Sequence, residues 1–458
     1  MKVIFTNPPF IRSKNSCAEN DFKISWWVVY NHKFWSHIPY GRLIFNWLVK
    51  YLKIWWSIRY GIRAGSRWPW TSEFPIGPFQ YPFFMWYAVS FLKDKWYDVE
   101  MIDAVAEHQY NYLKYIEDIK SRKPDLVVIE TSTPTRDIDI YVAEKFSEFA
   151  EVCLCGPHAS INANQIKKEY PFIKYILKWE YILNSWEMLK TKKEWIYESE
   201  LVKDFDKIPY PFRDYPEAIQ YYDWSMPTAK PQLQIYWSKG CPFHCVYCMW
   251  PQTMYQKMYM PRSPKAIANE IKHCVKKYWY KSILFDDDTF NIGNDRMSEL
   301  CDELKKIWLP WTMMWRLDTS PEELFDKMVD SGCVWMRFWI ETFDPQVSKN
   351  IKKWLIAENV KEKITYLSKK YPNLYLHVTM MKDLPWQTDE IHKKDMKILK
   401  ELWFSLWDKK RSYQLASCAP FPWTELYDTL KEKYWEELVN NWQNYDGWQS
   451  TIMKDLKF

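Results

Sequence analysis

The chain has 458 residues, with 63 Lys and Arg against 58 Asp and Glu, so its formal net charge is +5. This length predicts two or three domains whose cores need no disulfides. No basic block dominates any segment, which argues against a nucleic-acid-binding protein. No apolar run is long enough to span a membrane, and no signal-peptide pattern is visible, so we expect a cytoplasmic protein.

The first part of the chain alternates strand and helix patterns. Short apolar segments predict strands at 2–6, 98–102, 125–130, 151–155 and 174–177. Amphipathic segments between them predict helices near 82–95, 110–122, 137–149 and 161–169. This alternation predicts an open parallel sheet covered by helices on both faces. We therefore expect an α/β domain over 1–200, interrupted at 18–80 by an aromatic, basic insert whose fold the pattern does not define.

A Pro-rich segment at 208–211 indicates a linker over 201–225, and the alternation then restarts. Strands are predicted near 233–236, 282–286, 312–316, 334–340, 374–381 and 412–418. Helices are predicted near 264–277, 294–307, 321–331, 358–370 and 389–402. Six such units predict a partial, open (β/α)6 barrel over 226–430, followed by a C-terminal tail at 431–458. The chemistry of such a barrel lies at the carboxyl ends of its strands.

Three cysteines, Cys241, Cys245 and Cys248, directly follow the first strand of the predicted barrel. Thiolates at this spacing can hold one small metal centre on a loop. Iron–sulfur clusters normally use four cysteines, so three would leave one iron of a [4Fe–4S] cluster open for another ligand. A structural zinc site is the alternative, although it normally needs a fourth ligand.

This triplet, with Tyr247 before its last cysteine, resembles the fingerprint of the radical S-adenosylmethionine (SAM) enzymes, and the barrel resemblance covers about 225–430. The resemblance implies that the cysteines ligate a [4Fe–4S] cluster whose open iron chelates SAM. Reduction of that cluster then cleaves SAM and produces a 5′-deoxyadenosyl radical. Tyr247 is expected to approach the adenine.

Polar residues at the ends of the next three barrel strands fit the same site. The resemblance implies that carboxylates after the second strand bind the SAM ammonium, that Arg316 pairs with its carboxylate and that Glu341 binds its ribose hydroxyls. The carboxylates are Asp286, Asp287 and Asp288. A helix N-cap for the aspartates and ordinary ion pairs for the other two are the alternative interpretations.

The N-terminal domain is similar to the cobalamin-binding domain of the cobalamin-dependent subgroup, through short segments that follow its predicted strands. Ligands bind such sheets at the carboxyl ends of strands. The Asp-x-His-x-x-Gly signature of proteins with a histidine axial ligand is absent, so no histidine is expected to ligate cobalamin through that motif. Ordinary loop chemistry is the alternative. The candidate corrinoid-binding residues are Thr131, Ser132, Thr133, Gly156, Pro157 and Glu180.

Together these resemblances imply a cobalamin-dependent radical SAM enzyme, a methyltransferase acting on an unactivated carbon of a small molecule. They also imply a low-potential electron donor such as flavodoxin or ferredoxin. An oxidative cyclase of the tetrapyrrole type and a corrinoid or iron–sulfur sensor without catalysis are the alternatives. Methylthio transfer is disfavoured because the N-terminal domain offers only Cys17, Cys153 and Cys155 for a second cysteine trio. The pattern identifies neither a catalytic residue nor the substrate.

The tryptophan content is unusual, with 30 Trp and 9 Gly where an average chain would have about 32 Gly. Four Lys-rich helix patterns end at Trp96, Trp279, Trp308 and Trp403, where a left-handed residue, normally glycine, is expected. A genuinely Trp-rich protein is the alternative. We predict instead that many Trp stand where the natural protein has Gly, as when a UGA codon that encodes Gly is translated as Trp. The same exchange is expected beside the cofactor motifs, at Trp179, Trp386 and Trp423.

Overall fold

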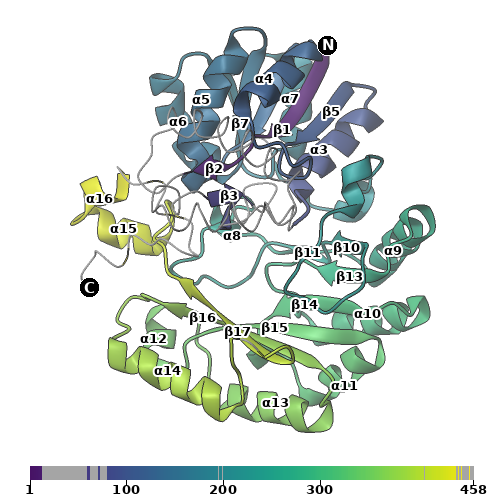
Figure 1. Ribbon diagram of the computed structural model, residues 1–458, viewed down its shortest axis with the longest axis vertical. Coiled ribbons are helices and arrows are strands. Elements are labelled where there is room, and N and C mark those ends of the chain that lie inside the picture. The colour runs from purple at the N-terminus through teal and green to yellow at the C-terminus, as the bar shows by residue number, and fades with distance from the viewer. Residues whose placement is uncertain are drawn as a thin grey trace, which may run out of the picture. The chain divides into compact units, whose positions relative to one another are not determined.

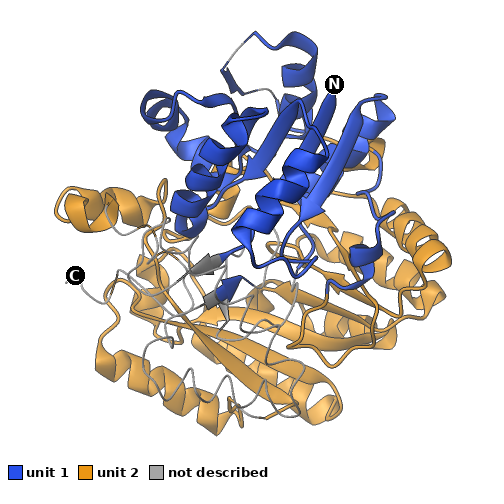
Figure 2. Ribbon diagram, turned by 45° about the horizontal axis from the view of Figure 1, so that its top comes forward, with its two compact units in different colours: residues 1–202, 209–221 blue, residues 203–208, 222–458 orange. Residues whose placement is uncertain are grey.

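The computed structural model describes residues 1–12, 59–61, 71–72 and 80–439 apart from 194, 199 and 407, together with the single residues 442, 445 and 453. Most of the predicted insert at 18–80, including Cys17, and most of the tail beyond 439 lie outside the described residues. Contacts divide the chain into two compact units, residues 1–202 with 209–221 and residues 203–208 with 222–458 (Figure 2). The segment predicted as a linker, 201–225, is divided between both units.

The first unit contains a six-stranded parallel sheet in the order β5-β1-β6-β7-β8-β9 (Figure 1). Its strands are β1 (Lys2–Asn7), β5 (Asp98–Asp103), β6 (Leu126–Glu130), β7 (Glu151–Cys155), β8 (Ile173–Leu177) and β9 (Ile196–Tyr197). The helices around it are α3 (Phe83–Asp94), α4 (Tyr112–Ser121), α5 (Arg136–Ser147), α6 (Pro157–Glu169) and α7 (Ile182–Thr191). The predicted parallel α/β domain is therefore confirmed.

Three short strands of the same unit form a separate antiparallel sheet in the order β2-β3-β4. They are β2 (Ile11–Arg12), β3 (Arg59–Gly61) and β4 (Thr71–Ser72). The last two are the described part of the predicted insert before residue 80.

The second unit contains a six-stranded parallel sheet in the order β10-β13-β14-β15-β16-β17. Its strands are β10 (Gln232–Ile235), β13 (Ser282–Phe285), β14 (Trp311–Trp315), β15 (Cys333–Glu341), β16 (Tyr375–Lys382) and β17 (Arg411–Ser417). The long helices are α9 (Pro264–Tyr278), α10 (Asn294–Ile307), α11 (Glu322–Asp330), α13 (Ala357–Lys370) and α14 (Asp389–Glu401). Since β10 and β17 do not pair, the barrel is open, as predicted.

Shorter elements lie in the connections of the second unit. They are β11 (Ser238–Lys239), β12 (Met260–Pro261), α8 (Trp250–Thr253), α12 (Pro345–Asn350), α15 (Glu425–Lys431) and α16 (Trp435–Val439). None of the described helices is long and apolar enough to cross a bilayer.

Alternation along the strands separates the two faces of the second sheet. On β10, Leu233 and Ile235 join the buried apolar core that includes residues of the outer helices, and the intervening Gln234 is buried on the opposite face. Helix α10 contributes to the same core through side chains spaced three and four residues apart, such as Met297, Leu300 and Leu304. The helices therefore cover one face of the sheet, while its other face carries buried polar side chains such as Gln234 beside apolar ones such as Leu284.

Eight tryptophans of the described residues have a positive φ, which is unusual for a side chain with a Cβ atom. The four predicted helix ends are among them, with φ of 65° at Trp96, 58° at Trp279, 61° at Trp308 and 63° at Trp403. Their indole rings are exposed, to 96% at Trp96 and 76% at Trp279. The predicted left-handed helix ends are confirmed. The other four are Trp179, Trp354, Trp386 and Trp423.

Candidate functional site

The cysteine loop follows β11 at the carboxyl end of β10. A Cβ atom on Gly240 would lie 2.0 Å from the backbone oxygen of Met258, and its φ is +76°, so the turn into the loop requires glycine. The backbone of Val246, inside the loop, donates to the carbonyl of Ile351 over 3.1 Å and accepts from the amide of Leu426 over 3.0 Å. These bonds fix the loop against two other connections of the barrel.

The three thiols share one electrostatic environment. Burial raises the pKa of Cys241 to about 12, and the neighbouring Asp288 and Cys245 raise it further. Burial also raises the pKa of Cys248, with added contributions from Cys245 and Cys241. Mutual repulsion of this kind is relieved when thiolates bind a cationic centre. In the described part of the chain no three Cys, His, Asp or Glu side chains form a site for a single metal ion.

The three predicted aspartates do not share one role. Asp287 is fully buried, and its carboxylate accepts hydrogen bonds from the amides of Trp237 and Ser238, at 3.2 and 2.5 Å, and from the Ser238 hydroxyl at 2.6 Å. Asp287 therefore ties the end of β13 to the segment that leads into the cysteine loop. Asp286 is also buried, whereas Asp288 is half-buried and raises the pKa of both Cys241 and Cys248.

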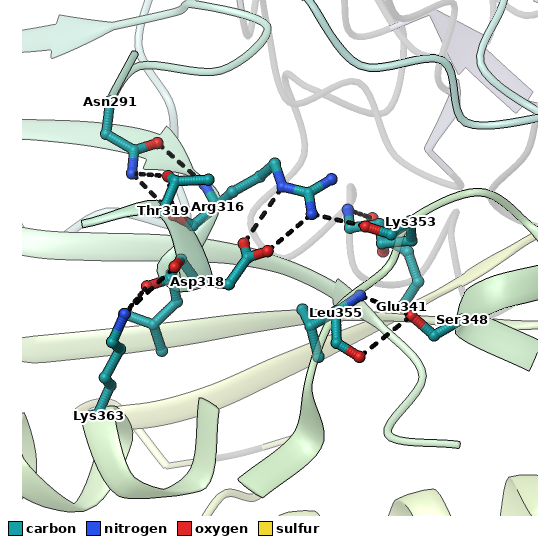
Figure 3. Close-up of polar contacts among 10 residues, drawn as sticks. Asn291, Arg316, Asp318, Thr319, Glu341, Ser348, Lys353, Leu355 and Lys363 are labelled. Carbon is teal, nitrogen blue, oxygen red and sulfur yellow. Dashed lines mark hydrogen bonds and ion pairs between the residues drawn. The ribbon is translucent and has the colours of Figure 1, made fainter. Parts of the chain in front are cut away.

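Arg316 follows β14 and is almost fully buried. Asp318 holds one edge of its guanidinium, with Nε to Oδ1 at 3.2 Å and Nη2 to Oδ2 at 2.8 Å, and Nη2 also donates to the carbonyl of Lys353 over 2.6 Å (Figure 3). Its Nη1 is buried and has no hydrogen-bond partner among the described residues. The guanidinium is thus fixed in orientation and keeps one donor for a ligand. Its face lies 3.9 Å from the centre of the Phe243 ring, inside the cysteine loop.

Glu341 ends β15 in a left-handed conformation, with φ of 68°. Such backbone strain in a residue other than glycine is characteristic of functional sites. Its Oε1 accepts from the Tyr247 hydroxyl over 3.2 Å. The same oxygen accepts from the Lys353 ammonium over 2.8 Å (Figure 3). Its Oε2 is buried and has no hydrogen-bond partner in the described part of the chain. Glu341 therefore keeps one acceptor for a ligand.

The structure thus brings together most of the side chains predicted for the barrel site. Tyr247 contacts Glu341 directly, and Lys353 connects Glu341 to Arg316. A buried acceptor on Glu341 and a buried donor on Arg316 fit a ligand that carries both hydroxyl and carboxylate groups, as SAM does. Sequence reasoning missed Lys353 and Asp318. The Arg-x-Asp spacing could have indicated Asp318, whereas nothing around Lys353 distinguishes it from the adjacent Lys352.

In the first unit, the candidate corrinoid-binding residues lie at the carboxyl ends of β6, β7 and β8. Ser132 and Thr135 form a capping box at the short 3-10 helix Thr133–Thr135, and Thr131, Ser132 and Thr133 are all buried. The Thr133 hydroxyl has no hydrogen-bond partner among the described residues. The loop after β6 therefore presents one hydroxyl without a hydrogen-bond partner among the described residues, at the edge where α/β sheets bind ligands.

The loop after β7 packs closely on the loop after β6. Gly156 has a φ of 94°, and a Cβ atom there would lie 2.6 Å from the carbonyl oxygen of Thr131, so only glycine fits. Pro157 begins α6 and is buried. After β8, the buried Glu180 accepts a hydrogen bond from the amide of Val202. Glu180 therefore holds the chain as it leaves the first unit, a role the sequence did not predict.

The second unit is thus an open parallel sheet with a three-cysteine loop near the carboxyl end of its first strand. Residues 235–394 match the family model of the radical SAM superfamily, so the resemblance predicted from the cysteine triplet is confirmed. The chain is also 24% identical over 384 residues to an uncharacterized methyltransferase of Pyrococcus horikoshii, which covers 78% of this chain and 80% of that protein.

Two solved structures share the fold over most of the chain. The radical SAM methyltransferase TsrM from Kitasatospora setae, solved with tryptophan and a SAM analogue, matches with a TM-score of 0.60 and 13% identity over 77% of this chain and 73% of that one. The cobalamin-dependent radical SAM enzyme OxsB, solved with aqua-cobalamin and SAM, matches with a TM-score of 0.63 and 16% identity over 82% of this chain and 62% of that one. The predicted fold class, an α/β domain before a partial barrel, is confirmed.

Proposed function

We propose that this protein is a cobalamin-dependent radical SAM enzyme that methylates an unactivated carbon of a small molecule. The observation that carries the proposal is the pairing of the three-cysteine loop with Arg316 and Glu341, each of which keeps one buried polar atom for a ligand. The similarity to methyltransferases and to the TsrM and OxsB structures supports it.

In this proposal Cys241, Cys245 and Cys248 hold a [4Fe–4S] cluster. These three thiolates would hold the cluster, which would supply the electron for SAM cleavage when bound. Arg316 Nη1 donates to the SAM carboxylate, and Glu341 Oε2 accepts from the ribose hydroxyls. Asp286 and Asp288 offer negative charge for the ammonium group, and Asp287 holds the backbone from which the cysteine loop begins. Tyr247, fixed by Glu341, borders the adenine.

The first unit would hold cobalamin, which supplies the methyl group when bound. Thr131, Ser132 and Thr133 offer hydroxyls to the polar part of the corrinoid, and Gly156 with Pro157 forms the adjacent loop, which packs against Thr131 because Gly156 has no side chain. Glu180 accepts a hydrogen bond from the Val202 amide and so holds the segment after β8. We further propose a low-potential electron donor such as flavodoxin or ferredoxin, a cytoplasmic location and no nucleic-acid partner.

Anaerobic reconstitution tests the proposal. The protein should bind about 4 Fe per chain, show a corrinoid spectrum and cleave SAM when reduced. Failure to take up iron would refute it. Binding of both cofactors without SAM cleavage would instead identify a sensor. With a substrate in hand, mass spectrometry distinguishes a methyl gain from the hydrogen loss that an oxidative cyclase would cause.

A further inference from the structure

Lys353 is a buried lysine in the connection after α12, and it contacts both side chains that the proposed function assigns to the ribose and the carboxylate of SAM. It is 4% exposed. Its ammonium lies 2.8 Å from Glu341 Oε1, and its own carbonyl accepts from Arg316 Nη2 over 2.6 Å (Figure 3). One residue therefore joins Glu341 and Arg316 through two different atoms.

The atoms that remain free after these contacts have complementary chemistry. Arg316 uses Nε and Nη2 for Asp318 and Lys353, which leaves the buried Nη1. Glu341 uses Oε1 for Tyr247 and Lys353, which leaves the buried Oε2. A guanidinium N–H suits a carboxylate, and a carboxylate oxygen suits hydroxyl donors. The contacts of Lys353, together with those of Asp318 and Tyr247, thus leave Arg316 Nη1 and Glu341 Oε2 for a ligand.

The Lys353 ammonium balances the charge of the buried Glu341 carboxylate. Glu341 is 3% exposed, and its other contact is the hydroxyl of Tyr247, which carries no positive charge. A buried carboxylate that loses its cation is strongly disfavoured. The Lys353 ammonium therefore compensates the charge of Glu341 while binding only one of its two oxygens.

The fold of the connection has other anchors. Ser348 Oγ accepts from the amide of Leu355 over 2.9 Å, and the Ser348 carbonyl accepts from the amide of Lys353 over 2.9 Å. The adjacent Lys352 pairs with Glu425 over 2.5 Å at the surface. The turn therefore does not depend on where the Lys353 ammonium lies.

We propose that Lys353 is a positioning residue for SAM. Its ammonium holds Glu341 so that Oε2 accepts the ribose hydroxyls, and its carbonyl holds Arg316 so that Nη1 meets the SAM carboxylate. This inference rests on the proposed function.

The test measures SAM binding to the anaerobically reconstituted full chain by calorimetry, together with the change that SAM causes in the electron paramagnetic resonance spectrum of the reduced cluster. Lys353→Met should raise the dissociation constant for SAM about tenfold or more while leaving the iron content unchanged. Lys353→Arg, which keeps the charge, should restore much of the affinity. Lys352→Met is the matched control from the same turn and should bind SAM as the parent does.

A double-mutant cycle separates positioning from a general loss of structure. If Lys353 acts through Glu341, Glu341→Gln combined with Lys353→Met should bind SAM no more weakly than Glu341→Gln alone. Parental affinity in Lys353→Met, loss of iron in that variant, or losses that simply add in the double variant would overturn the inference. A parent protein that takes up no iron or does not bind SAM would instead refute the proposed function.

Discussion

Replacement of Trp279 by glycine should stabilise the second unit. Trp279 ends α9 with a φ of 58°, and its amide donates to the carbonyl of Val275 over 3.0 Å, a bond that glycine would keep. The left-handed conformation costs a residue with a Cβ atom about 1–2 kcal/mol. Because the indole is 76% exposed, its removal sacrifices little buried surface.

Glycine recovers this cost but loses more chain entropy on folding, by about 0.5–1 kcal/mol. We therefore expect Trp279→Gly to raise the free energy of unfolding by about 1 kcal/mol, which for a unit of this size corresponds to about 2–4 °C in Tm. Calorimetric melting of the parent and the variant measures the difference. Trp308→Gly, at the end of α10, should behave in the same way.

Alanine at the same position is the matched control. Trp279→Ala removes the same indole but keeps the Cβ atom, so the conformational cost remains and Tm should change little. A Tm gain in the alanine variant equal to that in the glycine variant would refute the reasoning, because the benefit would then come from losing an exposed ring. Trp435→Gly, at an exposed Trp that begins the right-handed helix α16, relieves no left-handed strain and should not raise Tm.

Three further predictions concern the gene, the first unit and the cysteine loop. Sequencing the gene should show UGA at codons 279 and 308, and UGG at codons 96, 279, 308 and 403 would contradict the exchange of Gly for Trp. Burial raises the pKa of Asp139 from 3.8 to about 7. Between about pH 4 and 7 the folded chain therefore binds more protons than the unfolded chain. Because of this difference, Asp139 lowers the free energy of unfolding as pH rises through this range. Asp139→Asn should therefore gain stability relative to the parent by up to about 1.4 kcal/mol per pH unit in urea unfolding, whereas parallel pH profiles would exclude this role. Asp287→Asn should weaken the hydrogen bonds to Trp237 and Ser238, at a cost of about 1.5–3 kcal/mol, and lower the iron bound after reconstitution; parental iron content would show that the loop does not depend on them.

The sequence was most informative about site residues that belong to a local motif or follow directly after a predicted strand. The cysteine triplet is a local pattern, and the carboxyl ends of β14 and β15 at Arg316 and Glu341 follow from strand periodicity. Contacts between distant segments were not visible. Asp287 resembled a ligand for the SAM ammonium because it lies among three aspartates, yet it binds the backbone 49 and 50 residues earlier.

Lys353 is a site residue that the sequence did not reveal, although its partner is close in the chain. Its contact with Glu341 spans only 12 residues, but it depends on the path of the chain through α12 and on a turn with left-handed residues at Lys352 and Trp354. Neither a lysine pair nor a tryptophan predicts such a turn, because both residue types disfavour a positive φ. Glycine at position 354 would have indicated the turn in the sequence.

The tryptophan anomaly therefore bears on the site as well as on the helix ends. Trp354, with φ of 59° and an exposed ring, directly follows the residue that joins Glu341 to Arg316. A glycine there would adopt the turn without a Cβ penalty, whereas tryptophan adds about 1–2 kcal/mol of strain to the segment that presents Lys353. Trp386 and Trp423 carry the same left-handed geometry in the connections after β16 and β17. The backbone at these three connections thus has the conformation expected of glycine, although each of the three positions carries a tryptophan.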